Sequence, residues 1–120
     1  MRKTSLILGA ALVALLASFS LPTVNALAKM GMPEMITAAK TPAEHEKLAA
    51  QYEREAKAAR AKAQEHKLMA EAYRKAGGPL IEKLHFDQHC DALVKSYTST
   101  ADEFEALAKA EHEAAKEMKK

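Results

Sequence analysis

Apolar residues in the last third of the chain recur at alternating steps of three and four. This spacing places one stripe along an α-helix, with Glu111 as its single charged member. The apolar residues just before the stripe do not share its phase, so the pattern predicts a helix over about 86–118 that follows a loop or short turn at 76–85. The stripe consists of Phe86, Cys90, Leu93, Tyr97, Thr100, Phe104, Leu107, Glu111, Ala114 and Met118.

A first helix is expected over about 42–75. Thr41 can cap it, Pro42 suits the first helical position, and Glu44 stands where a capping box places its acid. Good helix formers follow without an internal Gly or Pro, until Gly77-Gly78-Pro79 ends the helix. The residues at heptad spacing on this helix are His45, Ala49, Tyr52, Ala56, Ala59, Ala63, His66, Ala70 and Tyr73.

Within this first helix, residues 45–52 and 66–73 carry the same pattern of His, an apolar residue, Ala and Tyr. A heptad pattern reused three heptads later produces such a repeat. We therefore interpret it as the geometry of the interface between the helices, and the alternative is a repeated ligand site.

Two helices of similar length with a short connection are expected to lie antiparallel. In that arrangement the alanine stretch of the first helix faces Tyr97, Thr100 and Phe104, and small residues against large ones let helices approach closely. The sequence thus predicts an all-α domain over 41–120, a long, coiled-coil-like antiparallel two-helix hairpin with an Ala-rich interface. Because the first helix has few large apolar side chains, we expect a homodimer that forms a four-helix bundle.

The beginning of the chain has a different character. Two basic residues precede an uncharged apolar stretch at 6–16, and a proline and small residues follow. This order predicts a secretory signal peptide over 1–28, cleaved after Ala26 or Ala28. The apolar stretch is shorter than the roughly 20 residues of a spanning helix, so we expect no membrane span after cleavage and a periplasmic or secreted protein.

Removing the signal peptide changes the charge balance. The 120-residue chain has 18 basic and 16 acidic residues, a formal net charge of +2. Arg2 and Lys3 leave with the signal, so 16 basic residues remain against 16 acidic ones. A neutral domain with interleaved charges offers no electrostatic footprint for nucleic acid or anionic lipid. The expected partners are therefore a second copy and possible envelope proteins.

The densest group of possible metal ligands lies at the start of the second helix. His85 and His89 are four residues apart, so on a helix they share a face and could bind Zn²⁺ or Cu²⁺. Cys90 points about 100° away from His89, toward the interface, and His66 falls about one turn from His89 in the antiparallel register. The alternative is that these are ordinary surface histidines.

Residues 29–40 lack a sustained period and contain Gly and Pro, so they are expected to form a flexible arm. Within the arm, Met30, Met32 and Met35 are close in sequence, and thioethers are soft ligands that suit Cu(I). A chance cluster or a small apolar docking patch explains them equally well.

The chain has a single cysteine, Cys90, which excludes an intrachain disulfide. Three interpretations remain open for its side chain. It can be a small buried residue of the interface, it can bridge two subunits in an oxidising compartment, or it can serve as a metal ligand or redox group.

The sequence contains no set of residues that indicates an enzyme. Gly77-Gly78-Pro79 lacks the Lys-Ser/Thr of a phosphate-binding loop, and no Gly-x-Ser-x-Gly segment is present. A two-helix hairpin also lacks the enclosed pocket in which catalysis usually takes place. We therefore expect no catalytic activity.

Three segments carry a resemblance: Thr41-Pro-Ala-Glu-His-Glu-Lys-Leu-Ala, His66-x-x-Met69-Ala70-x-x-Tyr73 and His89-Cys90-x-x-Leu93. They resemble small uncharacterised exported α-helical hairpin proteins of proteobacteria, which implies the hairpin fold and an envelope location over about 41–118 but no activity. The sequence thus favours a non-catalytic exported protein with a structural or protein-interaction role in the cell envelope. The alternative is a periplasmic copper- or zinc-binding protein.

Overall fold

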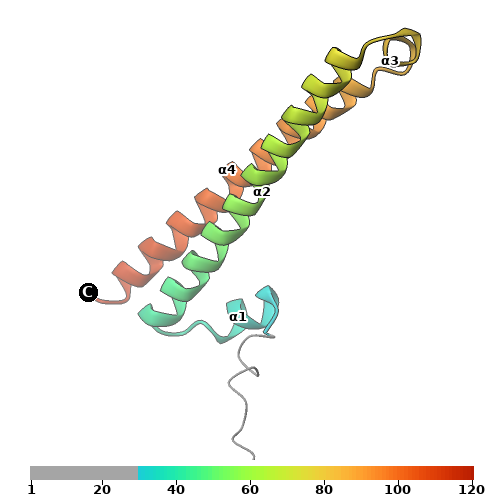
Figure 1. The fold of residues 1–120 in the computed structure, drawn as a ribbon. Helices are drawn as coiled ribbons and strands as arrows, with labels where there is room; N and C mark the ends of the chain where they lie inside the picture. The colour runs from blue at the N-terminus through green and yellow to red at the C-terminus, as the bar shows by residue number, and fades with distance from the viewer. Residues whose placement is uncertain (1–29) are drawn as a thin grey trace, which may run out of the picture.

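The computed structural model describes residues 30–120, so the expected signal peptide lies outside the described residues. The described part is helical and contains no β-strand, which confirms the all-α class (Figure 1). No helix between residues 30 and 120 combines the length and the apolar content needed to cross a membrane. The helices are α1 (Met32–Ala38), α2 (Pro42–Ala76), α3 (Pro79–Leu84) and α4 (Phe86–Glu117).

The first turn of α2 is closed by side-chain hydrogen bonds. The Glu44 amide donates to Thr41 Oγ1 at 3.3 Å, and Thr41 Oγ1 donates to Glu44 Oε2 at 3.0 Å. Glu44 Oε2 also accepts from the Lys40 amide at 2.8 Å, whereas in a standard capping box it reaches the cap residue's own amide. The Lys40 amide, followed by the Thr41 hydroxyl, lowers the pKa of Glu44.

The last turn of α2 is closed by glycine. Gly77 has φ 59° and Gly78 has φ 98°, both in the region that residues with a Cβ rarely adopt. The Gly77 amide donates to the Tyr73 carbonyl at 3.0 Å. Between these ends α2 has 35 residues, and at 1.5 Å per residue it is about 52 Å long.

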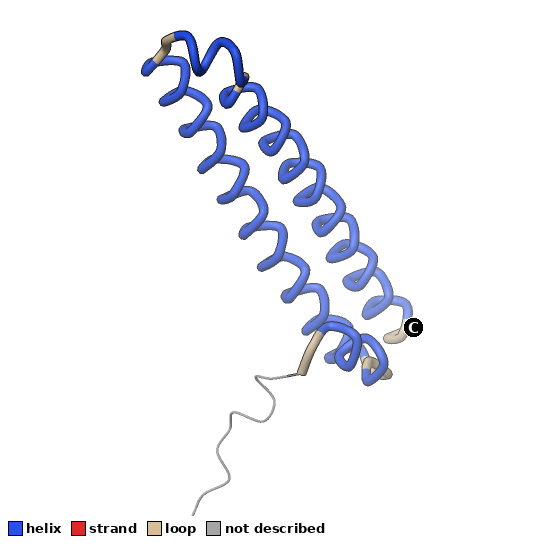
Figure 2. The backbone as a smooth tube through the Cα atoms, turned by 90° about the vertical axis from the view of Figure 1, so that its right-hand side faces the viewer, coloured by secondary structure: helices blue, strands red, loops and turns tan. Residues whose placement is uncertain are grey.

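Helices α2 and α4 lie side by side and run in opposite directions, with α3 at the end where they are joined (Figures 1 and 2). We call the other end, where α2 begins and α4 finishes, the open end. Charged side chains pair across the two helices at three levels, which defines their register. These pairs are Arg74 with Asp87 and Asp91 near α3, Arg60 with Asp102 and Glu105 in the middle, and His45 with Glu111 at the open end.

The interface between α2 and α4 is lined mainly by alanine. Eight of its eleven buried hydrophobic residues are Ala, and Leu48 is the largest side chain that is fully buried. A side chain of one carbon lets two helix backbones approach closely but contributes little apolar area. The alanines are Ala49, Ala56, Ala59, Ala63, Ala70, Ala101, Ala108 and Ala115.

Aromatic rings meet one another across this interface. Tyr97 and Phe104, which were expected to face the alanine stretch, each stack on a ring of α2 at one end of that stretch. A ring of α2 and a ring of α4 meet at the same height along the helices, and buried alanines occupy the turns between successive ring pairs. The stacked pairs are Tyr73–Phe86, His66–Tyr97 and Tyr52–Phe104, with centroids 5.2, 5.5 and 6.2 Å apart.

The stripe that α4 buries also differs from the predicted one at every second position. Leu93 and Leu107 are 40% and 42% exposed, Thr100 is exposed as well, and Ala114 is half-buried. The buried positions are one residue later, at Ala101, Ala108 and Ala115. Steps of three and four fit both the predicted positions and the observed ones. The alanines are the ones buried because they permit closer contact with the alanines of α2.

Two connecting segments contain more helix than the pattern predicted. The arm expected to be flexible over 29–40 contains α1, which packs against α2. The segment 76–85, expected as a loop or short turn, contains the six-residue α3. Prolines early in both short helices fix a helical φ, and sequence periodicity cannot detect helices of so few turns.

Candidate functional site

The structure separates the histidines and the cysteine that the sequence proposed as metal ligands. His85 lies between α3 and α4 with φ 53°, and both it and His89 are exposed. Cys90 is only 5% exposed and belongs to the buried interface. Among residues 30–120, no three side chains of the His, Cys, Asp and Glu types are grouped so that they could hold a metal ion.

His66 lies elsewhere than the sequence suggested. Its ring is stacked on Tyr97 with an interplanar angle of 8°, and Tyr97 is about two turns beyond His89 along α4. The Nδ1 atom of His66 is buried and has no hydrogen-bond partner. The expectation that His66 falls one turn from His89 is therefore replaced by an aromatic contact inside the interface.

The methionines lie at the opposite end of the α2–α4 pair from His85 and His89. Met32 begins α1, and Met30 and Met35 line a groove of about 360 Å³ between α1 and the first turns of α2, together with Lys47 and Arg54. Helix α1 is beside the open end, whereas His85 follows α3 (Figure 1). The arm and the His85–His89 pair thus do not form one site.

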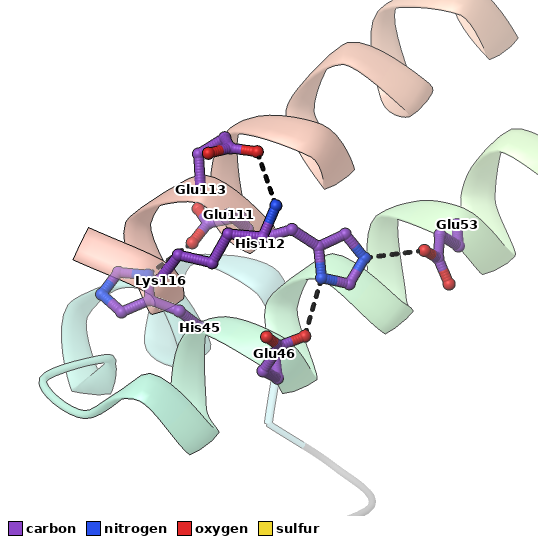
Figure 3. A network of polar contacts seen from close by, with 7 residues as sticks. All are labelled: His45, Glu46, Glu53, Glu111, His112, Glu113 and Lys116. Atoms are coloured by element: carbon purple, nitrogen blue, oxygen red, sulfur yellow. Dashed lines mark hydrogen bonds and ion pairs between the residues drawn. The ribbon is translucent and has the colours of Figure 1, made fainter. Parts of the chain in front are cut away.

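Histidines and glutamates meet at the open end, in a group that the sequence analysis did not single out (Figure 3). His45 Nδ1 lies 2.5 Å from Glu111 Oε2, and His112 Nδ1 lies 2.7 Å from Glu46 Oε2. Adjacent residues of α2 therefore pair with adjacent residues of α4, one histidine and one glutamate from each helix. With Glu53, these residues form what we call the open-end cluster.

Both ring nitrogens of His112 face carboxylates of α2. Nδ1 is 2.7 Å from Glu46 Oε2 and Nε2 is 2.9 Å from Glu53 Oε1 (Figure 3). Ionised carboxylates only accept hydrogen bonds, so both contacts are hydrogen bonds when the ring is a doubly protonated imidazolium. The hydrogen bonds to Glu53 and Glu46 accordingly raise the pKa of His112.

Two further charged residues complete the surroundings of His112. On α4, Lys116 pairs with Glu113 at 2.9 Å, and both line a shallow groove beside the histidine. An imidazolium has no free lone pair with which to bind a metal or accept a proton. In this protonation state His112 ties α4 to α2 and cannot itself act as a base.

One sequence signal could have revealed the open-end cluster. The tetrapeptide Ala-Glu-His-Glu occurs twice, at 43–46 near the start of α2 and at 110–113 near the end of α4. Antiparallel helices bring the start of one to the end of the other, so two copies of one motif meet. Neither copy by itself indicates which glutamate its histidine contacts.

Apart from His45–Glu111, whose histidine stands at a core heptad position, the cross-helix charge pairs lie on one side of the interface, which we call the charged flank. Its residues on α2 are seven or fourteen apart, the spacing at which heptad positions share a face. They are Glu46, Glu53, Arg60 and Arg74. In heptad terms they occupy the e positions, and the g positions lie on the other side of the interface.

The g positions form what we call the apolar flank. On α4 none of them is charged, and Leu93 and Leu107 are about two-fifths exposed. On α2, Met69 is 39% exposed at the same level as Leu93. The flank consists of Leu48, Glu55, Lys62 and Met69 on α2, of which Leu48 is 1% exposed, and of Phe86, Leu93, Thr100, Leu107 and Ala114 on α4.

Comparisons of the chain with protein-family models, with curated proteins and with solved structures give no match.

Proposed function

We propose that this chain is a non-catalytic exported protein with a structural or protein-interaction role in the cell envelope. In this proposal it acts as a helical hairpin that associates with a second copy into a four-helix bundle. The observation that carries the proposal is the position of the large apolar side chains, which lie mostly outside the α2–α4 interface while alanine lines it.

The exposed apolar residues on the two long helices support association. Met69, Leu93 and Leu107 are each about two-fifths exposed. Burial of one leucine side chain contributes on the order of 1.5–3 kcal/mol, more than a methyl group can supply. Exposed apolar residues that are contiguous mark interaction surfaces more often than free surface.

The envelope location rests on the expected signal peptide over 1–28. Export predicts that the protein recovered from the periplasm or the medium begins at Leu27 or Lys29, after cleavage at Ala26 or Ala28. Intact-mass measurement of the recovered chain tests this directly. Recovery of the full-length chain in the cytoplasm alone would refute the location and leave association untouched.

Thermal unfolding at several protein concentrations tests the association. Because a dimer unfolds to two chains, its Tm rises with concentration, whereas the Tm of a monomer does not change. We expect a rise in Tm between about 1 and 100 µM of the mature chain, followed by circular dichroism. A Tm that stays constant over this range would contradict self-association.

A further inference from the structure

The apolar flank of α4 alternates large and small side chains after Phe86. In chain order these positions are Leu93, Thr100, Leu107 and Ala114, spaced by seven. An antiparallel second copy centred between Thr100 and Leu107 places Leu93 opposite Ala114 of the second copy and Leu107 opposite its Thr100. Large residues then meet small ones, the arrangement that fills a helix interface without steric clashes.

The same flank on α2 is complementary in charge. Glu55 and Lys62 are seven residues apart. An antiparallel copy centred between them therefore places Glu55 opposite Lys62 of the second copy, and Lys62 opposite its Glu55. Within one chain Glu55 accepts from Gln51 at 2.8 Å, and Lys62 pairs with Glu65 at 2.7 Å. Opposite charges at a contact favour this pairing and disfavour a parallel one.

Both centres lie at the same level of the molecule. Arg60, next to the midpoint of Glu55 and Lys62, pairs with Asp102 at 2.9 Å and with Glu105 at 2.8 Å. These two acids stand on either side of the midpoint of Thr100 and Leu107. A single two-fold axis at the level of Arg60 therefore serves both helices.

We propose that a second copy of this chain docks on the apolar flank about that axis, perpendicular to the helices, with α4 against α4 and α2 against α2. Such an interface is isologous, because each residue pair occurs twice. The charged flank remains outside the bundle. This inference rests on the proposed self-association. It adds which surface the second copy contacts and which symmetry axis relates the two copies.

A two-fold axis parallel to the helices is the competing arrangement. It packs α2 of one copy against α4 of the other at equal levels, so Lys62 faces Thr100 of the second copy and Glu55 faces its Leu107. Both charges then lie against uncharged side chains, at a desolvation cost that no charge of the second copy offsets. The perpendicular axis is favoured because it pairs them.

Disulfide cross-linking between single-cysteine chains distinguishes the two arrangements. All variants carry Cys90→Ala, and Thr100→Cys chains are mixed with Leu107→Cys chains, oxidised and run on a non-reducing gel. We expect a dimer band several-fold stronger than when Lys109→Cys replaces Leu107→Cys, because Lys109 is exposed on the charged-flank side of α4. A stronger band between Thr100→Cys and Lys62→Cys would overturn the proposed symmetry.

Light scattering on two charge variants distinguishes an error in the proposed docking surface from an absence of self-association. Leu107→Glu is expected to weaken dimerisation about tenfold or more, since it places a carboxylate in the interface. Leu68→Glu, on the opposite surface of α2, is expected to leave dimerisation unchanged. If both variants associate as tightly as the parent, the face is wrong and self-association stands. If the parent is a monomer, both proposals fail.

Discussion

His112 is the residue whose surroundings depend most directly on pH. It bridges Glu46 and Glu53 of α2, with Glu113 and Lys116 beside it on α4. Its pKa is raised above the unfolded value of about 6.5 by the bonds to Glu53 and Glu46. The stability it contributes is fully present below that unfolded value and is lost as the pH rises through the folded pKa.

His112→Gln should therefore lower the free energy of unfolding at about pH 6 and have a smaller effect near pH 9. Urea unfolding of both proteins across this range measures the difference. His89→Gln is the matched control, because the His89 side chain is exposed and makes no hydrogen bond or ion pair among the contacts of the described residues. A difference that stays constant with pH would refute the imidazolium bridge.

His66 illustrates the opposite situation, a polar atom without a partner. Its buried Nδ1 makes no hydrogen bond, while the ring stacks on Tyr97. His66→Phe keeps the stack and removes the unpaired atom, so we expect it to raise the free energy of unfolding by roughly 1 kcal/mol. Denaturant unfolding checks this, with the exposed His89→Phe as control. A loss of stability in His66→Phe would show that the nitrogen is satisfied in solution.

At the level of the helices, local signals were sufficient to predict where α2 begins and ends. The capping residues Thr41 and Glu44 and the glycine stop at Gly77 act within a few residues of the ends they determine. The buried stripe of α4 was not determined locally, since Leu107 and Ala108 both fit the spacing. The choice depends on the alanines of α2, which are distant in sequence.

The individual contacts within the open-end cluster could not be predicted for the same reason. Whether His112 contacts Glu46 or Glu53 depends on the register of α4 along α2, and neither helix encodes that register by itself. The candidate metal ligands were chosen from spacing within one segment. Spacing placed His85 and His89 on one turn but gave no information about the third ligand that a site requires.

Close packing of α4 on α2 makes a prediction at the level of the helix pair. Ala108 is 3% exposed, so Ala108→Leu forces the helices apart and should lower the free energy of unfolding by about 1–3 kcal/mol. The matched control is Ala106→Leu, at an exposed position of the same helix, with an expected change within about 0.5 kcal/mol. Equal effects in denaturant unfolding would contradict an interface closed by alanine.

For the whole molecule, the two sides of the α2–α4 interface have different roles. The charged flank pairs α2 with α4 through Arg60, Arg74 and His112. The apolar flank presents Leu93 and Leu107 to the outside. In the proposed dimer, the charge pairs therefore link α2 to α4 within one chain, and the apolar residues contact the second copy.

Sedimentation equilibrium of residues 29–120, without the proposed signal peptide, tests the central claim most directly. The claim is that the alanine-lined hairpin forms half of a four-helix bundle. At micromolar concentration we expect a mass twice that of one chain, with circular dichroism showing the helix content of the structure. A single-chain mass with the same helix content would contradict the claim.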